Sequence, residues 1–110
     1  MAYATTDQLA EALRIRVTPA NQQLLADCLD SAAEEIDQWL DRPEESPLPE
    51  PTPPGIVRCN VNRAVEWYKA ADAAYGMVGF DQVGVRQAPT DGFTRHGYSI
   101  TRWKLRWAVA

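Results

Sequence analysis

Apolar positions in the first half of the chain recur every three or four residues, which is the period of an α-helix. The clearest run comprises Leu25, Cys28, Leu29, Ala32, Ile36, Trp39 and Leu40. Thr18 and Pro19 precede this run as an N-cap residue and a first-turn proline. A shorter run follows Thr5 and Gln8, whose types and spacing match a capping box. The pattern predicts two helices, over residues 6–15 and 19–42.

A third helix is predicted over residues 56–75. Its apolar stripe is formed by Val57, Val61, Ala64, Val65, Tyr68, Ala71 and Tyr75. Gly76 follows as a C-cap candidate. The preceding residues 43–54 read PEESPLPEPTPP, and six prolines exclude both a helix and a central strand there. This extended connector is interpreted as a spacer between two helices, with a surface arm lying on a neighbouring molecule as the alternative.

The pattern changes after Gly76, where glycines interrupt the chain repeatedly. Val83 and Val85 alternate with polar or small residues, and Asp91-Gly92 is a hairpin signal. Residues 77–98 are therefore predicted to form a long loop or a β-hairpin arm. The C-terminal element, residues 99–107, fits either a short helix or a strand. The whole chain, residues 1–110, is predicted to be one mainly α domain: a small bundle of three main helices.

Charge is distributed unevenly along the chain. The net charge is −4, which argues against a general nucleic-acid-binding protein. Residues 1–50 carry 11 acidic and 3 basic side chains, whereas residues 86–110 carry 1 acidic and 5 basic side chains. The chain thus combines an acidic first half with a basic C-terminal segment, and such asymmetry often concerns partners rather than the fold.

The apolar runs and the cysteines argue against a membrane-spanning, an exported or a disulfide-rich protein. No run approaches the roughly 18 apolar residues of a membrane span, and the N-terminus lacks a signal-peptide pattern. Two cysteines do not form a disulfide scaffold, and both are expected to be reduced.

Catalytic chemistry has little support in the sequence. Cys28, Cys59 and His96 lack the spacing of metal ligands. A nucleophilic pair of Cys59 and His96, as in a hydrolase, is conceivable but is outweighed by the commoner role of cysteine as a buried apolar residue. The glycines do not match a phosphate-binding loop. We expect no catalytic residues, no cofactor and no metal, and hence no enzyme.

The C-terminal segment carries the candidate interaction residues, since Trp and Arg are enriched at binding hot spots. The sequence interleaves Arg102, Trp103, Lys104, Arg106 and Trp107. Trp67, Arg86 and Arg95 are further interface candidates. The tryptophans could simply close the core while the basic side chains face outward. Alternatively, aromatic and basic side chains could together bind single-stranded nucleic acid.

Several motifs together resemble a known family. They are an opening MAYAT-x-x-x-L-x-x-x-L helix, the run from Ile36 to Pro43, the Pro-rich connector, a helix carrying Trp67-Tyr68, and a closing W-x-x-A at residues 107–110. This layout resembles the head-to-tail connector (head–tail adaptor) proteins of long-tailed phages, especially those infecting actinobacteria. The resemblance covers nearly the whole chain. It departs at residues 88–101, where a more acidic, helix-forming stretch is expected.

The resemblance implies a mainly helical virion assembly protein, without catalytic residues or cofactor. Such proteins form a ring, commonly dodecameric, beneath the portal protein at the capsid vertex. The ring extends the channel through which DNA passes without specific binding, and it offers a surface to stopper or tail-side connector proteins. The location would be the head–tail interface of the virion, with assembly in the host cytoplasm and no membrane. The alternative is a small helical nucleic-acid-binding module that uses its basic, Trp-containing tail.

Overall fold

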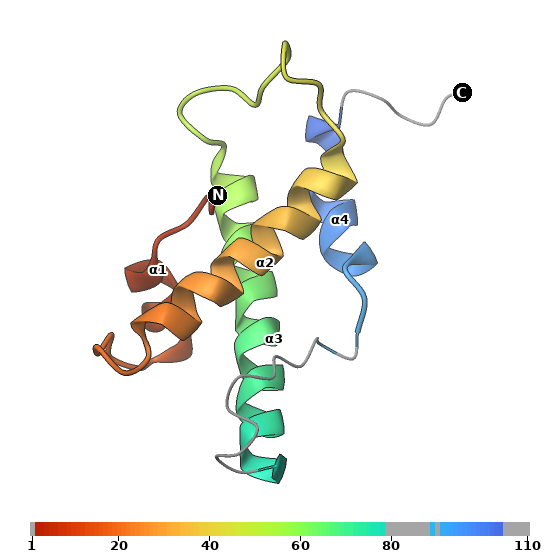
Figure 1. Ribbon diagram of the computed structural model, residues 1–110. Coiled ribbons are helices and arrows are strands. Elements are labelled where there is room, and N and C mark those ends of the chain that lie inside the picture. The colour runs from red at the N-terminus through yellow and green to blue at the C-terminus, as the bar shows by residue number, and fades with distance from the viewer. Residues whose placement is uncertain (1, 79–88, 90, 105–110) are drawn as a thin grey trace.

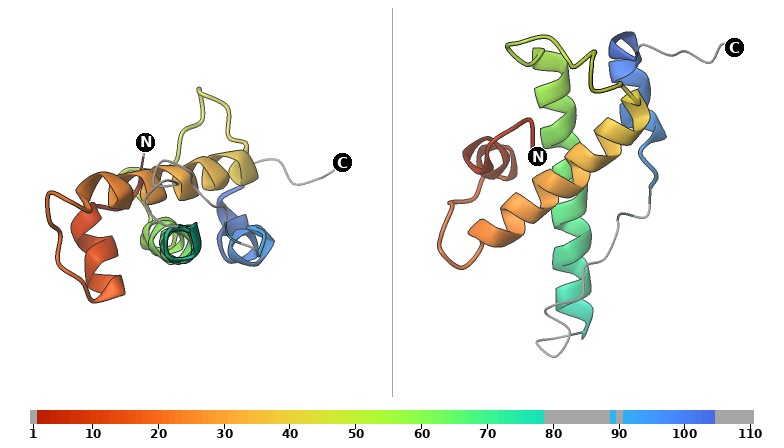
Figure 2. Two further views of the ribbon diagram at one scale, coloured as in Figure 1. Left: turned by 60° about the horizontal axis from the view of Figure 1, so that its bottom comes forward. Right: turned by 45° about the horizontal axis from the view of Figure 1, so that its top comes forward.

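The computed structural model describes residues 2–78, 89 and 91–104. In this part the chain forms α1 (Thr6–Leu13), α2 (Gln22–Leu40), α3 (Pro54–Val78) and α4 (Thr94–Ile100), followed by the 3-10 turn η2 (Thr101–Trp103). α2 crosses the long helix α3, and α4 lies beside the N-terminal half of α3 (Figure 1). Seen nearly along α3, α2 lies across both α3 and α4, which lie side by side beneath it (Figure 2). The prediction of a mainly helical bundle with three main helices is confirmed.

α1 begins where the sequence predicts. The Gln8 backbone N–H donates to Thr5 Oγ1 at 3.1 Å, and the Thr5 N–H donates to Gln8 Oε1 at 2.8 Å. This capping box pairs two backbone donors that would otherwise be left without partners. The helix ends at Leu13 because Arg14 adopts a left-handed conformation, with φ 60° and ψ 41°. Residues 14 and 15 therefore lie outside the helix that was predicted to include them.

α2 starts three residues later than predicted, at Gln22. Thr18 Oγ1 accepts the Asn21 backbone N–H, and Asn21 Oδ1 accepts the Thr18 N–H at 2.8 Å. This reciprocal pair closes a turn over residues 19–21 ahead of the helix. Thr18 thus caps the turn, while Asn21 occupies the N-cap position of α2. At the other end Asp41 terminates α2 in a left-handed conformation, with φ 47°.

α3 is longer at both ends than the predicted range 56–75. It starts at Pro54, where a missing backbone N–H costs nothing. It continues through Gly76 to Val78, so the prediction of Gly76 as a C-cap residue is wrong. A glycine inside a helix costs only about 1 kcal/mol relative to alanine.

The largest correction concerns the predicted hairpin arm. Residues 94–98 belong to helix α4, and the described residues contain no strand. Phe93, Gly97 and Ile100 recur at helical spacing, and this face packs against α2 and α3. The prediction missed this spacing because it divided the segment between an arm and a tail. For the C-terminal element, the described residues are helical and then turn; residues 79–88 and 105–110 lie outside the described part.

Two buried clusters form the core along α2. The first joins α1 to the N-terminal half of α2 and to α3, through Leu9, Ala10, Leu25, Cys28, Leu29, Ala32 and Ala64. The second joins the C-terminal half of α2 to the start of α3 and to α4, through Ile36, Leu40, Ile56, Cys59 and Ile100. α3 is therefore covered on more than one side.

Candidate functional site

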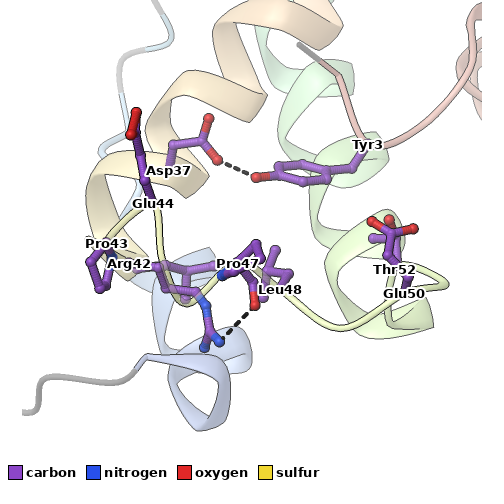
Figure 3. Close-up of a pocket in the computed structure, with 10 residues that line it drawn as sticks. Tyr3, Asp37, Arg42, Pro43, Glu44, Pro47, Leu48, Glu50 and Thr52 are labelled. Carbon is purple, nitrogen blue, oxygen red and sulfur yellow. Dashed lines mark hydrogen bonds between the residues drawn. The ribbon is translucent and has the colours of Figure 1, made fainter.

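The C-terminal end of α2 joins segments that are far apart in the sequence. Tyr3, before α1, donates its phenolic O–H to Asp37 (Figure 3). Trp39 packs against Gly97 of α4. Both Asp37 and Trp39 belong to the run from Ile36 to Pro43 that carries the resemblance. We call this region around Asp37 and Trp39 the joint.

Arg42 binds three backbone carbonyls in the joint. Its Nε donates to the Ser46 carbonyl at 2.9 Å and its Nη2 to the Pro47 carbonyl at 3.0 Å. Its Nη1 donates to the Trp103 carbonyl at 2.5 Å. One guanidinium group thus fixes both the Pro-rich connector and η2 to the end of α2, using the planar donor geometry that lysine lacks. The first residues of the connector are bound within their own chain.

A pocket of about 440 Å³ lies in the joint, beneath the Pro-rich connector (Figure 3). Its lining includes Tyr3, Leu40 and Leu48 together with the acidic side chains of Asp37, Glu44 and Glu50. Burial, reinforced by the hydrogen bond to Asp37, raises the pKa of Tyr3 well above its ordinary value of 10.0. Tyr3 therefore remains a neutral hydrogen-bond donor. Among the described residues, no three His, Cys, Asp or Glu side chains are placed to hold a metal ion.

The three described tail residues, Arg102, Trp103 and Lys104, make different contacts. Arg102 is exposed, and its guanidinium carbon lies 5.0 Å from the centroid of the Trp103 ring. Trp103 is half-buried against the second core cluster, as the core-closing interpretation predicts. Lys104 Nζ donates to the Trp39 carbonyl at 2.6 Å. The ammonium group lies near the C-terminal end of α2, where the helix dipole stabilises a positive charge. Arg86, Arg106 and Trp107 lie outside the described residues.

The two other described candidates, Trp67 and Arg95, belong to a network of charged side chains. Arg63 is its centre and only 2% exposed. Its Nε and Nη2 bind the two carboxylate oxygens of Glu35 at 2.8 and 2.9 Å. Its Nη1 binds Glu66 at 2.6 Å, and Trp67 donates its indole N–H to Glu35 at 2.8 Å. The network connects α2 with α3.

The same network reaches α4. Arg95 pairs with Glu66, and His96 Nε2 lies 3.0 Å from Glu66 Oε1. Burial opposes ionisation of Glu66, but hydrogen bonds from Arg63 and His96 outweigh it, so the pKa of Glu66 lies below its usual value. Hydrogen bonds to Glu35 raise the pKa of Arg63 despite the opposing effect of burial. Both shifts favour the ionised forms of Arg63 and Glu66, and the network holds three helices together.

Sequence reasoning missed Arg63, Glu35 and a further residue, Asn60. Asn60 is fully buried, and its Oδ1 accepts the backbone N–H groups of Tyr3 and Ala4, each at 2.8 Å. Its Nδ2 donates to the Leu29 carbonyl at 3.0 Å. The only available signal was a polar residue inside an apolar helical stretch, which does not identify the segment that it binds.

Cys59 and His96 lie near each other but are not arranged as nucleophile and base. The Cys59 thiol donates to the backbone carbonyl of His96 at 3.8 Å, whereas the His96 ring faces Glu66. Burial raises the pKa of Cys59 to about 11, although Ser99 and Arg63 oppose that effect. Nucleophilic attack needs a thiolate, which this environment disfavours.

Comparisons of the chain with protein-family models, with curated proteins and with solved structures each return no match. In the described part of the chain, no helix combines the length and the apolar character that a membrane span requires.

Proposed function

We propose that this chain is a virion assembly protein that resembles head-to-tail connectors and forms a ring below a phage portal protein. The ring extends the DNA channel and joins head to tail. The observation that supports this proposal is the joint. Tyr3 of the MAYAT motif and the run from Ile36 to Pro43 both carry the resemblance, and they meet there with η2.

Contacts in the joint connect these motifs, which are far apart in the sequence. Asp37 binds the N-terminal segment, and Arg42 binds the Pro-rich connector and the residue before Lys104. A protein that presents its ends and its connector to neighbouring molecules needs each of these segments attached to the helical bundle at a defined point.

Light scattering on the purified full chain, alone and mixed with the portal protein encoded beside it, tests the proposal. We expect a ring-sized species in at least one of the two samples. A chain that stays monomeric and leaves the portal protein's mass unchanged would contradict it. A titration with single- and double-stranded DNA at low salt would then decide for the alternative, a nucleic-acid-binding module, whose affinity must fall as salt rises.

A phage-complementation assay tests the predicted role of the tail. The double change Arg102→Glu and Arg106→Glu is expected to reduce the yield of tailed, infectious particles, because the reversed charges oppose the contact with the portal or the next subunit. The double change Arg14→Glu and Arg16→Glu is the matched control, since it alters the net charge equally near α1. An equal yield from the tail variant and from wild type would remove the tail from the interface.

A further inference from the structure

The outward face of α4 and η2 presents an aromatic side chain between two arginines. Tyr98 is 72% exposed, and among the described residues it is the exposed large hydrophobic side chain. Arg95 precedes it by three residues on the same side of α4, and Arg102 follows by four residues in η2; both arginines are exposed. Gly97 and Ile100 occupy the opposite, buried face. Tyrosine and arginine are the residue types that most often dominate binding energy at protein interfaces. We name Arg95, Tyr98 and Arg102 the α4 face.

The outward face of α2 carries charge of the opposite sign. Asp30, Glu34, Asp37 and Asp41 follow one another at steps of four, three and four residues, and all are exposed. They lie opposite the buried side of the helix. The sequence has no lysine or arginine from residue 17 to residue 41. Like charges at this spacing destabilise a helix, so a basic partner would relieve a cost that the free chain bears. We name these four residues the α2 face.

The two faces cannot meet within one molecule. α4 packs beneath α2, with Gly97 directly against Trp39. The α2 face lies on the side of α2 opposite its buried residues. The α4 face lies opposite the buried Gly97 and Ile100, although Tyr98 also packs edge-to-face on Trp39 and Arg95 pairs with Glu66. The contact between them therefore has to join two molecules.

We propose that the α4 face of one copy of this chain docks on the α2 face of a second copy. The spacing agrees, since Arg95 and Arg102 are seven residues apart, as are both Asp30 from Asp37 and Glu34 from Asp41. Within α2 seven residues correspond to roughly 10 Å, and the long arginine side chains of α4 and η2 can reach two carboxylates at that separation, with Tyr98 between them. Two different surfaces are used, and such a contact propagates from copy to copy and gives a ring when the rotation between neighbouring copies closes.

Arg95 can take part without breaking the charged network. Its present partner, Glu66, also binds Arg63 and His96, and it keeps both when Arg95 turns outward. The side chain of Arg95 is already 65% exposed. The docking contact rests on the proposed function, because it supplies the subunit interface of the proposed ring.

Charge reversal on each face separately, followed by mixing, tests the contact. The first variant is Asp30→Lys with Glu34→Lys, and the second is Arg95→Glu with Arg102→Glu. The first variant leaves the α2 face with two lysines and two aspartates and hence no net charge, and the second variant makes both faces acidic. We therefore expect the self-association of either variant to weaken at least about tenfold by sedimentation velocity. In an equimolar mixture the unaltered basic α4 face of the first variant meets the unaltered acidic α2 face of the second, so the mixture is expected to associate again. High salt should weaken the wild-type assembly.

Matched controls change the net charge by the same amount elsewhere. They are Glu11→Lys with Glu45→Lys, and Arg16→Glu with Arg58→Glu, and both should assemble as wild type does. Circular dichroism confirms that each variant folds, and Tyr98→Ala probes the same face without changing charge.

The outcomes separate this contact from the proposed function. If wild type assembles but either reversed variant assembles equally well, or if the mixture assembles no better than its components, the docking contact is wrong and the proposed function stands. If wild type assembles neither alone nor with the portal protein, both fail.

Discussion

Replacing Gly97 with alanine probes the packing of α4 on α2 directly. A methyl group on Gly97 would lie 2.4 Å from Cε2, 2.5 Å from Cδ2 and 2.7 Å from Cζ2 of Trp39. Carbon atoms in favourable contact are about 3.5–4.0 Å apart, so the ring or α4 must move by roughly 1 Å. The ring of Trp39 is confined, because it also packs edge-to-face on Phe93 and Tyr98, with centroid distances of 6.0 and 5.9 Å.

Two opposing effects set the size of the expected change. Overpacking costs about 1–3 kcal/mol, and the contact with three ring atoms places Gly97→Ala at the upper end. Alanine is favoured over glycine inside a helix by about 1 kcal/mol. The net loss is therefore about 2 kcal/mol. For a chain of 110 residues, at ~4 °C per kcal/mol, the melting temperature should fall by roughly 8 °C.

Thermal and urea unfolding, followed by circular dichroism, measure this loss. Gly92→Ala is the control, because no heavy atom lies within 4 Å of the added methyl group. A double-mutant cycle with Trp39→Leu isolates the clash, and in that background Gly97→Ala should become neutral or stabilising. The reasoning is refuted if Gly97→Ala is as stable as wild type, or if it destabilises equally after Trp39 has been replaced.

Three further changes test the buried polar contacts. Arg63→Ala leaves Glu35 without its bidentate partner. Because the Glu35 carboxylate is 23% exposed, the free energy of unfolding measured in urea should fall by about 3 kcal/mol, the lower end for a buried pair. A decrease below about 1 kcal/mol would contradict the role of the network. The folded state lowers the pKa of Glu66, so wild type should lose stability as the pH falls below about 4.5. Glu66→Gln should lose less over the same pH range, and parallel curves would refute this. Asn60→Ala should cost about 2–3 kcal/mol and accelerate amide hydrogen exchange at Tyr3, and unchanged exchange would show that the N-terminal segment is held by other contacts.

Local signals predicted the helices well wherever neighbouring residues decide the structure. The capping box of Thr5 and Gln8 needs only residues within one turn, and it forms as expected. The apolar stripe from Leu25 to Leu40 becomes the buried side of α2. The predicted helix boundaries were less accurate. α2 starts at Gln22 and not at residue 19, because Thr18 and Asn21 close a separate turn ahead of it.

Residues that act through distant partners could not be recognised in the sequence. Asn60 binds a backbone segment that lies 56 and 57 residues away, and Arg63 binds Glu35, 28 residues away. α4 was missed for a related reason: its short, glycine-containing sequence becomes helical by packing on Trp39 and the second core cluster. Tertiary contacts outweigh weak local propensity in so short a helix.

The three bonds of Arg42 also determine how the molecule would carry mechanical load. A pull applied beyond Lys104 reaches α2 first through the carbonyls of Trp103 and Trp39, held by Arg42 and Lys104. The hydrogen bonds of Arg42 and Lys104 would be loaded together, in shear along the end of α2. They would be loaded before the buried side chain of Ile100 left the second core cluster. Because the same guanidinium also holds Ser46 and Pro47, tension on the C-terminal segment would be transmitted to the connector as well. Arg42 thus connects the C-terminal segment, the end of α2 and the connector in one path for mechanical force.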